Sequence, residues 1–433
     1  MPLSRHTKGT TFYSVLCAFV VQIISYYLRV DLFNRGLTQR LSTYYLMEAS
    51  MSKIMISVGE ASGDLHGASV AYALKAIEPD IQLFGMGGQG MRAAGVDIVY
   101  DIADLGVIGF VEIIKNLPKL YRLRDTLGEL MDTERPDALV IIDYHGFNIR
   151  LAKVAKSKGI PVLAYICPKV WAWGRGRAKV MAETVERVAA IFPFEVDIFR
   201  EYGANVTFVG NPLLDIVKTT MPKNEAYEYF GANAGQPLVL LLPGSRQQEI
   251  VNLLPVMLDA AVQISAQVPN CQFFLPVAST ISREMLHDII SNYNITVIMT
   301  KNNTYDLMNI ADMAVAASGT VTLETAILQL PTVVIYKLAA LTYLIGKMII
   351  KIPYISLPNI VAGKEIVPEL VQNTVTPENI AREAIQILTD PKVHSKMVKD
   401  LADMCQKLGP TGAVERVARE ILAIAHSPAG GKL

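Results

Sequence analysis

The sequence lacks the residue patterns that mark several common protein classes. Its four cysteines include no Cys-x-x-Cys pair, which argues against a disulfide framework or a cysteine zinc site and favours a reducing compartment, best the cytoplasm. Its six histidines show no His-x-x-x-His or His-Glu-x-x-His spacing, so no tightly held transition metal is expected. Forty basic and forty acidic side chains cancel, which gives no global attraction to nucleic acid. Any anion site must therefore be local.

A long, purely apolar run is also missing. The stretch from Phe12 to Leu28 has 17 residues and contains Gln22, whereas a helix needs about 20 to cross a bilayer. Residues 1–50 are therefore interpreted as an N-terminal extension. Three explanations stay open: a membrane anchor, an uncleaved signal, or sequence upstream of a true start at Met51.

From Lys53 onward, apolar runs of strand length alternate with amphipathic stretches of helix length. Near-continuous apolar strands separated by helices indicate parallel sheets covered on both faces. Two such series predict an α/β protein with two doubly wound, Rossmann-like domains at residues 51–211 and 237–395. The polar, strand-free stretch 212–236 between them is the predicted linker. Ligands of such sheets bind beyond the carboxyl ends of the strands.

Two strand ends of the first series carry carboxylates. The stretch VGEASGD follows the strand KIMIS and supplies Glu60, Ser62 and Asp64. The strand ALVIID ends at Asp143, which is placed to deprotonate an attacking hydroxyl. His145 is an alternative proton acceptor, although a histidine there is more often a hydrogen-bonding loop residue.

Two strand ends of the second series look suited to phosphate. Gly244, Ser245 and Arg246 form a glycine turn with a hydroxyl and a guanidinium at the mouth of a helix. The segment from Ser318 through Gly319 and Thr320 to Glu324 also opens a helix, whose first amides can receive phosphate oxygens while Glu324 takes a ribose hydroxyl. The alternative for both is an ordinary capped helix with a solvated carboxylate.

The only two tryptophans, Trp171 and Trp173, follow the strand PVLAYI. One of them lies against a sugar or acyl chain, or both pack in the core. The run from Gly85 to Gly90 matches the dinucleotide pattern G-x-G-x-x-G, with Asp101 and Asp104 downstream. It follows the second strand and leaves too few residues for a long helix, so a close-packed turn is expected instead.

Two segments combine an apolar face with a cationic border, residues 107–124 and residues 338–355. Neither is long enough to span a bilayer, and both are suited to its interface. Ordinary buried helices would show the same pattern.

Taken together, the motifs resemble those of the lipid-A-disaccharide synthase family of bacterial glycosyltransferases. The likeness runs from about Lys53 to beyond Gln372 and rests on ten stretches in the family's order: GEASGDLHGA, GMGGQGMRAAG, LGVIGFVEI, DYHGFN, CPKVWAW, FPFE, VGNPLLD, LLPGSR, SGTVTLE and SLPNIVAGKEIVPELVQ. Residues 1–50 have no counterpart in the family, which favours the start at Met51.

The resemblance implies a GT-B fold and an inverting transfer without metal or cofactor. The donor would be UDP-2,3-diacylglucosamine and the acceptor 2,3-diacylglucosamine 1-phosphate, giving a β-1,6-linked disaccharide 1-phosphate and UDP. It also implies a homodimer, peripheral association with the inner membrane, and C-terminal helices at 396–433 that return to the first domain.

The resemblance also implies roles for residues. The base is Asp143 or Glu60, with acceptor-side ligands Ser62, Asp64, Asn148 and Trp171. The donor is held by Gly244, Ser245, Arg246, Ser318, Gly319, Thr320, Glu324, Asn359, Glu365 and Glu369. Three positions depart from the family pattern: His145 replaces the usual proline, Asn211 a histidine and Cys167 a serine. The Asn211 change puts acid–base duty at that position in doubt.

Three rival functions stay open on the sequence alone. They are another UDP-sugar transferase or epimerase of the same fold, a nicotinamide oxidoreductase using Gly85 to Gly90, and a non-catalytic lipid-binding module.

Overall fold

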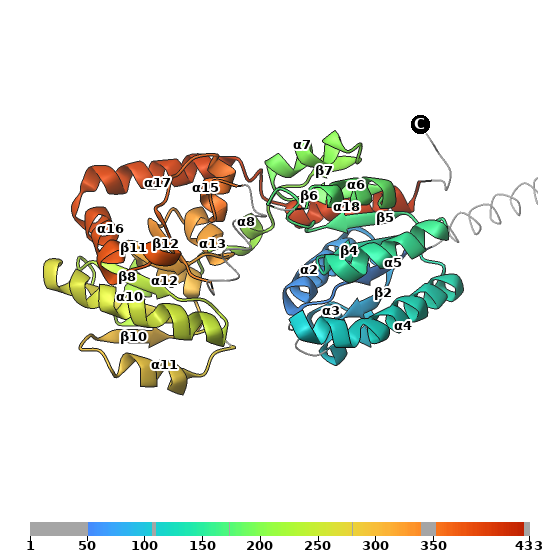
Figure 1. The fold of residues 1–433 in the computed structure, drawn as a ribbon. Coiled ribbons are helices and arrows are strands. Elements are labelled where there is room, and N and C mark those ends of the chain that lie inside the picture. The colour runs from blue at the N-terminus through green and yellow to red at the C-terminus, as the bar shows by residue number, and fades with distance from the viewer. Residues whose placement is uncertain (1–50, 106–109, 173, 279, 339–351, 428–433) are drawn as a thin grey trace, which may run out of the picture. The chain divides into compact units, whose positions relative to one another are not determined.

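Two parallel sheets, each covered by helices on both faces, organise the chain (Figure 1). The computed structural model describes residues 51–105, 110–172, 174–278, 280–338 and 352–427, and for 110–116 it describes the backbone alone. The predicted extension 1–50 lies outside these residues. The chain from Lys53 onward forms one unit, and the predicted α/β class with two doubly wound sheets is confirmed.

The first sheet has seven parallel strands in the order β3-β2-β1-β4-β5-β6-β7. The strands are β1 Lys53–Ser57, β2 Gln82–Gly87, β3 Asp97–Asp101, β4 Ala138–Ile142, β5 Val162–Tyr165, β6 Arg187–Ala190 and β7 Val206–Phe208. The helices between them are α2 Ala61–Ile77, α3 Gln89–Ala93, α4 Phe110–Glu134, α5 His145–Ser157, α6 Gly176–Thr184 and α7 Pro193–Glu201.

The second sheet has six parallel strands in the order β10-β9-β8-β11-β12-β13. The strands are β8 Leu238–Leu242, β9 Gln272–Pro276, β10 Val297–Thr300, β11 Met313–Ala317, β12 Thr332–Tyr336 and β13 Glu369–Val371. The accompanying helices are α10 Gln247–Gln267, α11 Arg283–Ile290, α12 Thr304–Ile310, α13 Val321–Ile327, α15 Leu357–Ala362, α16 Pro377–Thr389 and α17 Pro391–Gln406.

The central strands are buried on both faces, as their apolar runs predict. Every residue of β4 and β8 is buried, because helices cover both sides of each sheet. Sequence patterns missed two of the four edge strands, β3 and β13. Strand β3 alternates exposed and half-buried residues, and β13 has only three residues, so neither offers the continuous apolar run that identifies a buried strand.

The predicted linker at 212–236 contains two short helices, α8 Leu213–Ile216 and α9 Lys223–Phe230. Ala226 and Phe230 of α9 are buried in the same apolar cluster as Leu238 and Leu240 of β8. The second half of this segment therefore packs as part of the second sheet's core.

The C-terminal helices divide between the two sheets. Helix α17 packs on α13, α15 and α16, whereas α18, Ala413–Ala425, packs on α2, β4, β5 and β6 of the first sheet (Figure 1). Val417 and Ile421 of α18 are fully buried there. The Asp215 carboxylate accepts hydrogen bonds from the Gly412 and Ala413 amides, 2.7 and 2.9 Å away, and so satisfies the start of α18. The return predicted for 396–433 is thus made by α18, because α17 already has its apolar face on the second sheet.

Among the described residues, α10 is the one helix whose length and apolar composition would suffice for a membrane span. It is a core helix of the second sheet, with Leu254, Met257 and Leu258 fully buried against the strands. The structure describes no side chains for residues 107–116 and 339–351. Most of the two segments predicted to face a membrane therefore lies outside the described side chains.

A buried carboxyl group stands at the start of α7. Both backbone amides of Ile191 and Phe192 donate to Glu195 Oε2, at 3.1 and 3.2 Å, and the side chain is almost fully buried. Burial raises the pKa of Glu195 to about 7, although the two amide bonds and Trp171 work in the opposite direction. The folded state therefore holds this proton to a higher pH than the unfolded chain does.

The sign of this shift predicts a pH dependence of stability. Glu195 contributes most below the ordinary carboxyl pKa of 4.5, and its contribution is lost as pH rises through about 7. Glu195→Gln does not titrate and keeps an acceptor oxygen. We therefore expect its free energy of unfolding, relative to that of the wild type, to rise by roughly 2 kcal/mol from pH 5 to pH 8. Thermal unfolding at both pH values measures this, with the exposed Glu201→Gln on the same helix as control. A Tm difference that does not change with pH would contradict the prediction.

Candidate active site

The two candidate bases lie at the point where the first sheet reverses its strand order. Strand β1 continues to β2 on one side, while its other neighbour, β4, leads to β5, β6 and β7. Ser57 of β1 pairs with Ile141 of β4, so the carboxyl ends of these strands are adjacent. Glu60 follows β1 and Asp143 follows β4. Ligands of open α/β sheets bind at such a switch point.

The loop after β4 has a strained backbone. Asp143 and Tyr144 have φ values of 51° and 45°, in the left-handed region that L-residues seldom adopt. The Tyr144 ring lies directly over Gly59, where a Cβ would come within 2.1 Å of ring carbons. Only glycine at position 59 permits this approach. Strain of this kind is concentrated at functional sites, where the surrounding structure enforces it.

Asn148 enforces the loop conformation. Its side-chain amide donates to the carbonyls of Asp143, Ile142 and Ser57 at 2.8, 3.2 and 3.1 Å. Its Oδ1 accepts a 2.7 Å hydrogen bond from the Ser57 hydroxyl, and both side chains are fully buried. The residue predicted as a substrate ligand therefore ties the ends of β1 and β4 together. Its role as a ligand stays a prediction.

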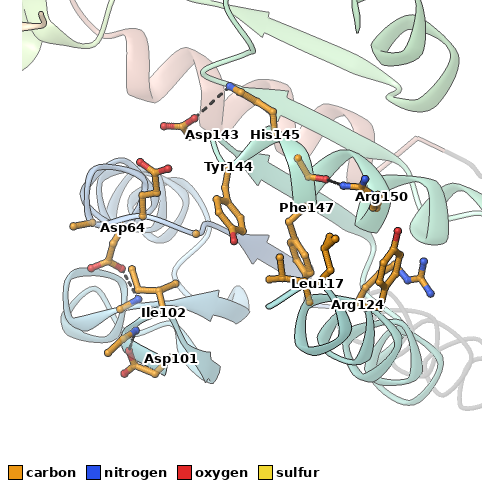
Figure 2. Close-up of a pocket in the computed structure, with 18 of the residues that line it drawn as sticks. Asp64, Asp101, Ile102, Leu117, Arg124, Asp143, Tyr144, His145, Phe147 and Arg150 are labelled. Carbon is orange, nitrogen blue, oxygen red and sulfur yellow. Dashed lines mark hydrogen bonds and ion pairs between the residues drawn. The ribbon is translucent and has the colours of Figure 1, made fainter. Parts of the chain in front are cut away.

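A cavity of about 1250 Å³ opens over this switch point (Figure 2). It brings together Glu60, Asp143 and His145 with an apolar group and several arginines. The apolar group is Ile102, Leu117, Leu120, Tyr144 and Phe147, and the arginines from the first sheet's elements are Arg92, Arg124, Arg150 and Arg177. Such a lining suits a ligand that is partly apolar and partly anionic.

The charged groups at the switch point influence one another. His145 Nε2 lies 3.3 Å from Asp143 Oδ1. Burial lowers the pKa of His145 and the Asp143 charge only partly offsets this, so the imidazole is mainly neutral at pH 7. Burial, and then the Asp143 charge, raise the pKa of Glu60. The arrangement offers a proton acceptor beside a neutral imidazole, and both candidate bases remain open.

The glycine-rich turn after β2 has an internal ligand. The Asp64 carboxylate accepts hydrogen bonds from the amides of Gly88, Gly90 and Met91 at 2.7, 2.7 and 3.1 Å. A Cβ at Gly88 or Gly90 would lie within 2.9 Å of Asp64 Oδ2. These glycines thus admit a carboxylate of the same chain where a dinucleotide pyrophosphate would bind. Asp64 is also one of the cavity-lining residues, and its role as a substrate ligand stays a prediction.

The second sheet reverses its strand order between β8 and β11, and both predicted phosphate turns follow these strands. In the turn after β8, Glu249 Oε2 accepts from the Ser245 and Arg246 amides at 3.2 and 3.3 Å, and Glu249 Oε1 pairs with the Arg246 guanidinium at 2.9 Å. The Arg246 side chain is 82% exposed. A diphosphate would therefore compete with Glu249 for these donors. Gly244 has φ 115° and passes close to the same carboxylate.

The turn after β11 is more open. Gly319 and Thr320 are exposed, and a Cβ at Gly319 would meet nothing within 4 Å. The Ser318 hydroxyl donates to the carbonyl of Ile355 at 3.2 Å. Glu324 lines a separate cavity of about 470 Å³ together with Tyr305. Burial raises the pKa of Glu324, while a hydrogen bond with Tyr305 works against that rise.

Asn359 and Glu369, predicted near the donor, bind each other and the neighbouring backbone. Asn359 is fully buried, donates to Glu369 Oε1 at 2.8 Å and accepts from the amides of Ile366 and Val367. Glu369 accepts from the amides of Ile355 and Ser356, both at 2.9 Å. Glu365, by contrast, is exposed.

The remaining predicted ligands lie in different surroundings. Ser62 is exposed in the first turn of α2. Trp171 packs edge-on against Phe194, with ring centroids 5.4 Å apart, and is absent from the cavity lining. Trp173 lies outside the described residues. In the part of the chain that the structure describes, no three His, Cys, Asp or Glu side chains gather to hold a metal ion.

Sequence reasoning missed Gly59 and Tyr144, because a left-handed tyrosine has no sequence signature. It also missed Arg92, Arg124, Arg150 and Arg177 as cavity-lining residues. A helical-spacing argument would have found one of them: Phe147 and Arg150 are three residues apart on α5, which places them on one face of that helix.

The hydrogen bonds of Asn148 predict a measurable destabilisation. Asn148→Ala leaves three carbonyls and the Ser57 hydroxyl without this buried partner, and we expect it to cost about 2–4 kcal/mol of stability. Amide exchange at Tyr144 to Phe147 should also accelerate. Thermal unfolding and hydrogen–deuterium exchange measure both effects, with the exposed Asn205→Ala as control. Unchanged exchange in this loop would show that Asn148 does not hold it.

Comparison with known proteins gives the family. Residues 54–421 match the family model described as lipid-A-disaccharide synthetase. The chain is 44% identical over 366 residues to the lipid-A-disaccharide synthase of Syntrophus aciditrophicus, covering 84% of this chain and 96% of that protein. It is 41% identical over 377 residues to the same enzyme of Geobacter sulfurreducens, covering 87% and 98%.

Solved structures of low identity share the fold. The UDP-GlcNAc 2-epimerase of Neisseria meningitidis aligns with a TM-score of 0.60 at 13% identity, covering 86% of this chain and all of that one. The calicheamicin glycosyltransferase CalG4 aligns with a TM-score of 0.57 at 12% identity, covering 88% and 100%. The family model and the two sequence relatives show that the chain belongs to the lipid-A-disaccharide synthetase family of glycosyltransferases.

Proposed function

We propose that the chain transfers 2,3-diacylglucosamine from its UDP donor to the 6-hydroxyl of 2,3-diacylglucosamine 1-phosphate. The acceptor oxygen forms a bond to the anomeric carbon while the bond from that carbon to the β-phosphate oxygen breaks. The products are a β-1,6 disaccharide 1-phosphate and UDP, with the anomeric configuration inverted. The relatives' names support the disaccharide product, and the groups at the two switch points support a base-assisted transfer with a stabilised leaving group.

The first sheet supplies the proton acceptor. In the proposal the acceptor hydroxyl approaches Asp143, which takes its proton as the new bond forms. The His145 imidazole, whose Nε2 lies 3.3 Å from Asp143 Oδ1, helps to orient the Asp143 carboxylate. Glu60 keeps the alternative base role, since its raised pKa brings it closer to the operating pH.

The second sheet stabilises the leaving UDP. Charge accumulates on the β-phosphate oxygen as the glycosidic bond breaks, and the open turn at Ser318 to Thr320 presents amides and hydroxyls to it. Arg246 reaches the diphosphate by exchanging Glu249 for phosphate oxygens, a step that its exposed guanidinium permits. Glu324 takes a ribose hydroxyl.

The single observation that carries this proposal is the loop Asp143–Tyr144. A backbone held in the left-handed region by Asn148 places a carboxylate at the switch point, inside a cavity with an apolar lining. Stability gains nothing from that conformation, whereas a base must be held in a fixed position for catalysis. The lining residues Ile102, Leu117 and Phe147 suit acyl chains.

The direct test supplies purified protein with both acylated sugars and measures UDP and disaccharide. We expect equimolar release of both products and a β-anomeric proton coupling in the disaccharide. Conversion of the UDP-sugar without acceptor would indicate an epimerase instead, and absence of any product would refute transfer.

Asp143→Asn should lower kcat by about 10²-fold or more, the usual scale for loss of a general base. The affinity for UDP should stay within about twofold, because the proposed UDP ligands lie on the second sheet. Glu60→Gln is assayed in parallel. The base is the residue whose replacement removes the fall in rate on the acid side of the pH–rate profile. Asp97→Asn on the exposed edge strand is the control. A collapse of UDP affinity in Asp143→Asn would make Asp143 structural.

We also propose that the protein works as a homodimer on the cytoplasmic face of the inner membrane. The apolar and cationic segments 107–124 and 338–355 support a peripheral attachment. Replacing Leu117 and Leu120 by serine should move the protein toward the soluble fraction in cell fractionation. Unchanged partition would contradict attachment through the first segment.

A further inference from the structure

Two arginines and a tyrosine form a cluster at one side of the cavity, away from the candidate bases. The guanidinium carbon of Arg124, on α4, lies 5.1 Å from the centroid of the Tyr121 ring. That of Arg150, on α5, lies 6.0 Å from the same centroid. One aromatic ring therefore gathers cations from two helices, and all three side chains line the cavity. Figure 2 shows Phe147 and Leu117 between Tyr144 and these arginines.

The other charges of the cavity are largely matched within the chain. Arg92 pairs with Asp101 at 3.0 Å, and Asp64 is held by three backbone amides. Glu60, Asp143 and His145 form the group at the switch point. Arg177 lines the cavity as well.

The cluster, in contrast, is short of negative charge. Arg124 donates to Asp125 Oδ1 through Nε and Nη2, at 2.9 and 2.5 Å, so the cluster has one carboxylate for two guanidinium groups, and that carboxylate is 59% exposed. Arg150 donates to the carbonyl of Gly146 and has no ion pair with a carboxylate among the described residues. Two guanidinium groups around one ring repel each other, and a doubly charged anion between them would offset that repulsion.

The chemistry of the cluster selects the anion. Arginine binds phosphate oxygens through two parallel N–H donors, and stacking on an aromatic ring fixes the orientation of its plane. The apolar side chains beside the cluster exclude a fully hydrated polyanion and suit an acylated molecule that ends in a phosphate.

We propose that Arg124 and Arg150, aligned by Tyr121, bind the phosphate monoester of the acceptor. This inference rests on the proposed function and adds a specificity site to it. The sugar then extends from the cluster past Phe147 toward Asp143. Binding the phosphate there selects the phosphorylated sugar over its uncharged analogue and sets which hydroxyl reaches the base.

The test compares two acceptors, 2,3-diacylglucosamine 1-phosphate and the same sugar without phosphate, in detergent solution. Wild type should strongly prefer the phosphorylated acceptor. Arg124→Gln and Arg150→Gln should each raise its KM by about tenfold or more, the scale of a lost charged hydrogen bond, with kcat little changed. On the unphosphorylated acceptor their kcat/KM should stay within about twofold of wild type.

Two further variants separate binding from folding. Tyr121→Leu should raise the KM for the phosphorylated acceptor by about threefold, because it removes only the alignment of the guanidinium planes. Arg200→Gln, an exposed arginine on α7, should change neither acceptor's kinetics. Equal losses on both acceptors, or none on either, would overturn the proposal. Wild-type protein that transfers to neither acceptor would instead refute the proposed function, and the inference with it.

The phosphate has two conceivable sources, the acceptor and an anionic membrane lipid. Inorganic phosphate should inhibit wild type competitively with the phosphorylated acceptor, and inhibit Arg124→Gln and Arg150→Gln at least about tenfold more weakly. Cosedimentation with phosphatidylglycerol vesicles should be the same for wild type and both variants. Variants that lose vesicle binding but keep the acceptor preference would assign the cluster to lipid headgroups and overturn the proposal.

Discussion

The hydrogen bonds of Asn148 are the interaction on which the first sheet's site depends. They join the last residues of β1 and β4 and hold Asp143 and Tyr144 in a conformation that neither residue adopts freely. The candidate base Asp143 is therefore attached to the centre of a buried parallel sheet. A loop that is already held by hydrogen bonds loses little entropy when substrate arrives, which is the condition for accurate positioning.

Other side chains of the chain also satisfy backbone groups of turns and helix starts. Five carboxylates each accept two or more hydrogen bonds from backbone amides of turns or helix starts. They belong to Asp64, Glu249, Glu369, Asp215 and Asp306. In each place an internal anion satisfies donors that would otherwise be unpaired. Turns that look like ligand sites by their glycines and hydroxyls can thus already be filled, as the turn after β2 shows. Among the predicted phosphate turns, the one after β11 stays open.

The sequence was sufficient for every strand of the two sheets except β3 and β13, and for the positions of Glu60 and Asp143. Buried parallel strands leave continuous apolar runs, and their carboxyl ends meet at one edge, so β1 and β4 could be located together with the loop residues after each strand. Long-range pairing left no such signal. The capture of the Gly88 and Gly90 amides by Asp64, and the meeting of Arg150 with Tyr121, depend on how separate helices lie over the sheet.

Helix α18 has a consequence for synthesis. Its buried residues Val417 and Ile421 share one face of the first sheet with α2, so part of that face stays uncovered until nearly the whole polypeptide has left the ribosome. The second sheet, whose elements are contiguous from α9 to α17, can assemble earlier. The nascent first lobe would then depend on chaperones for longer than its position in the chain suggests.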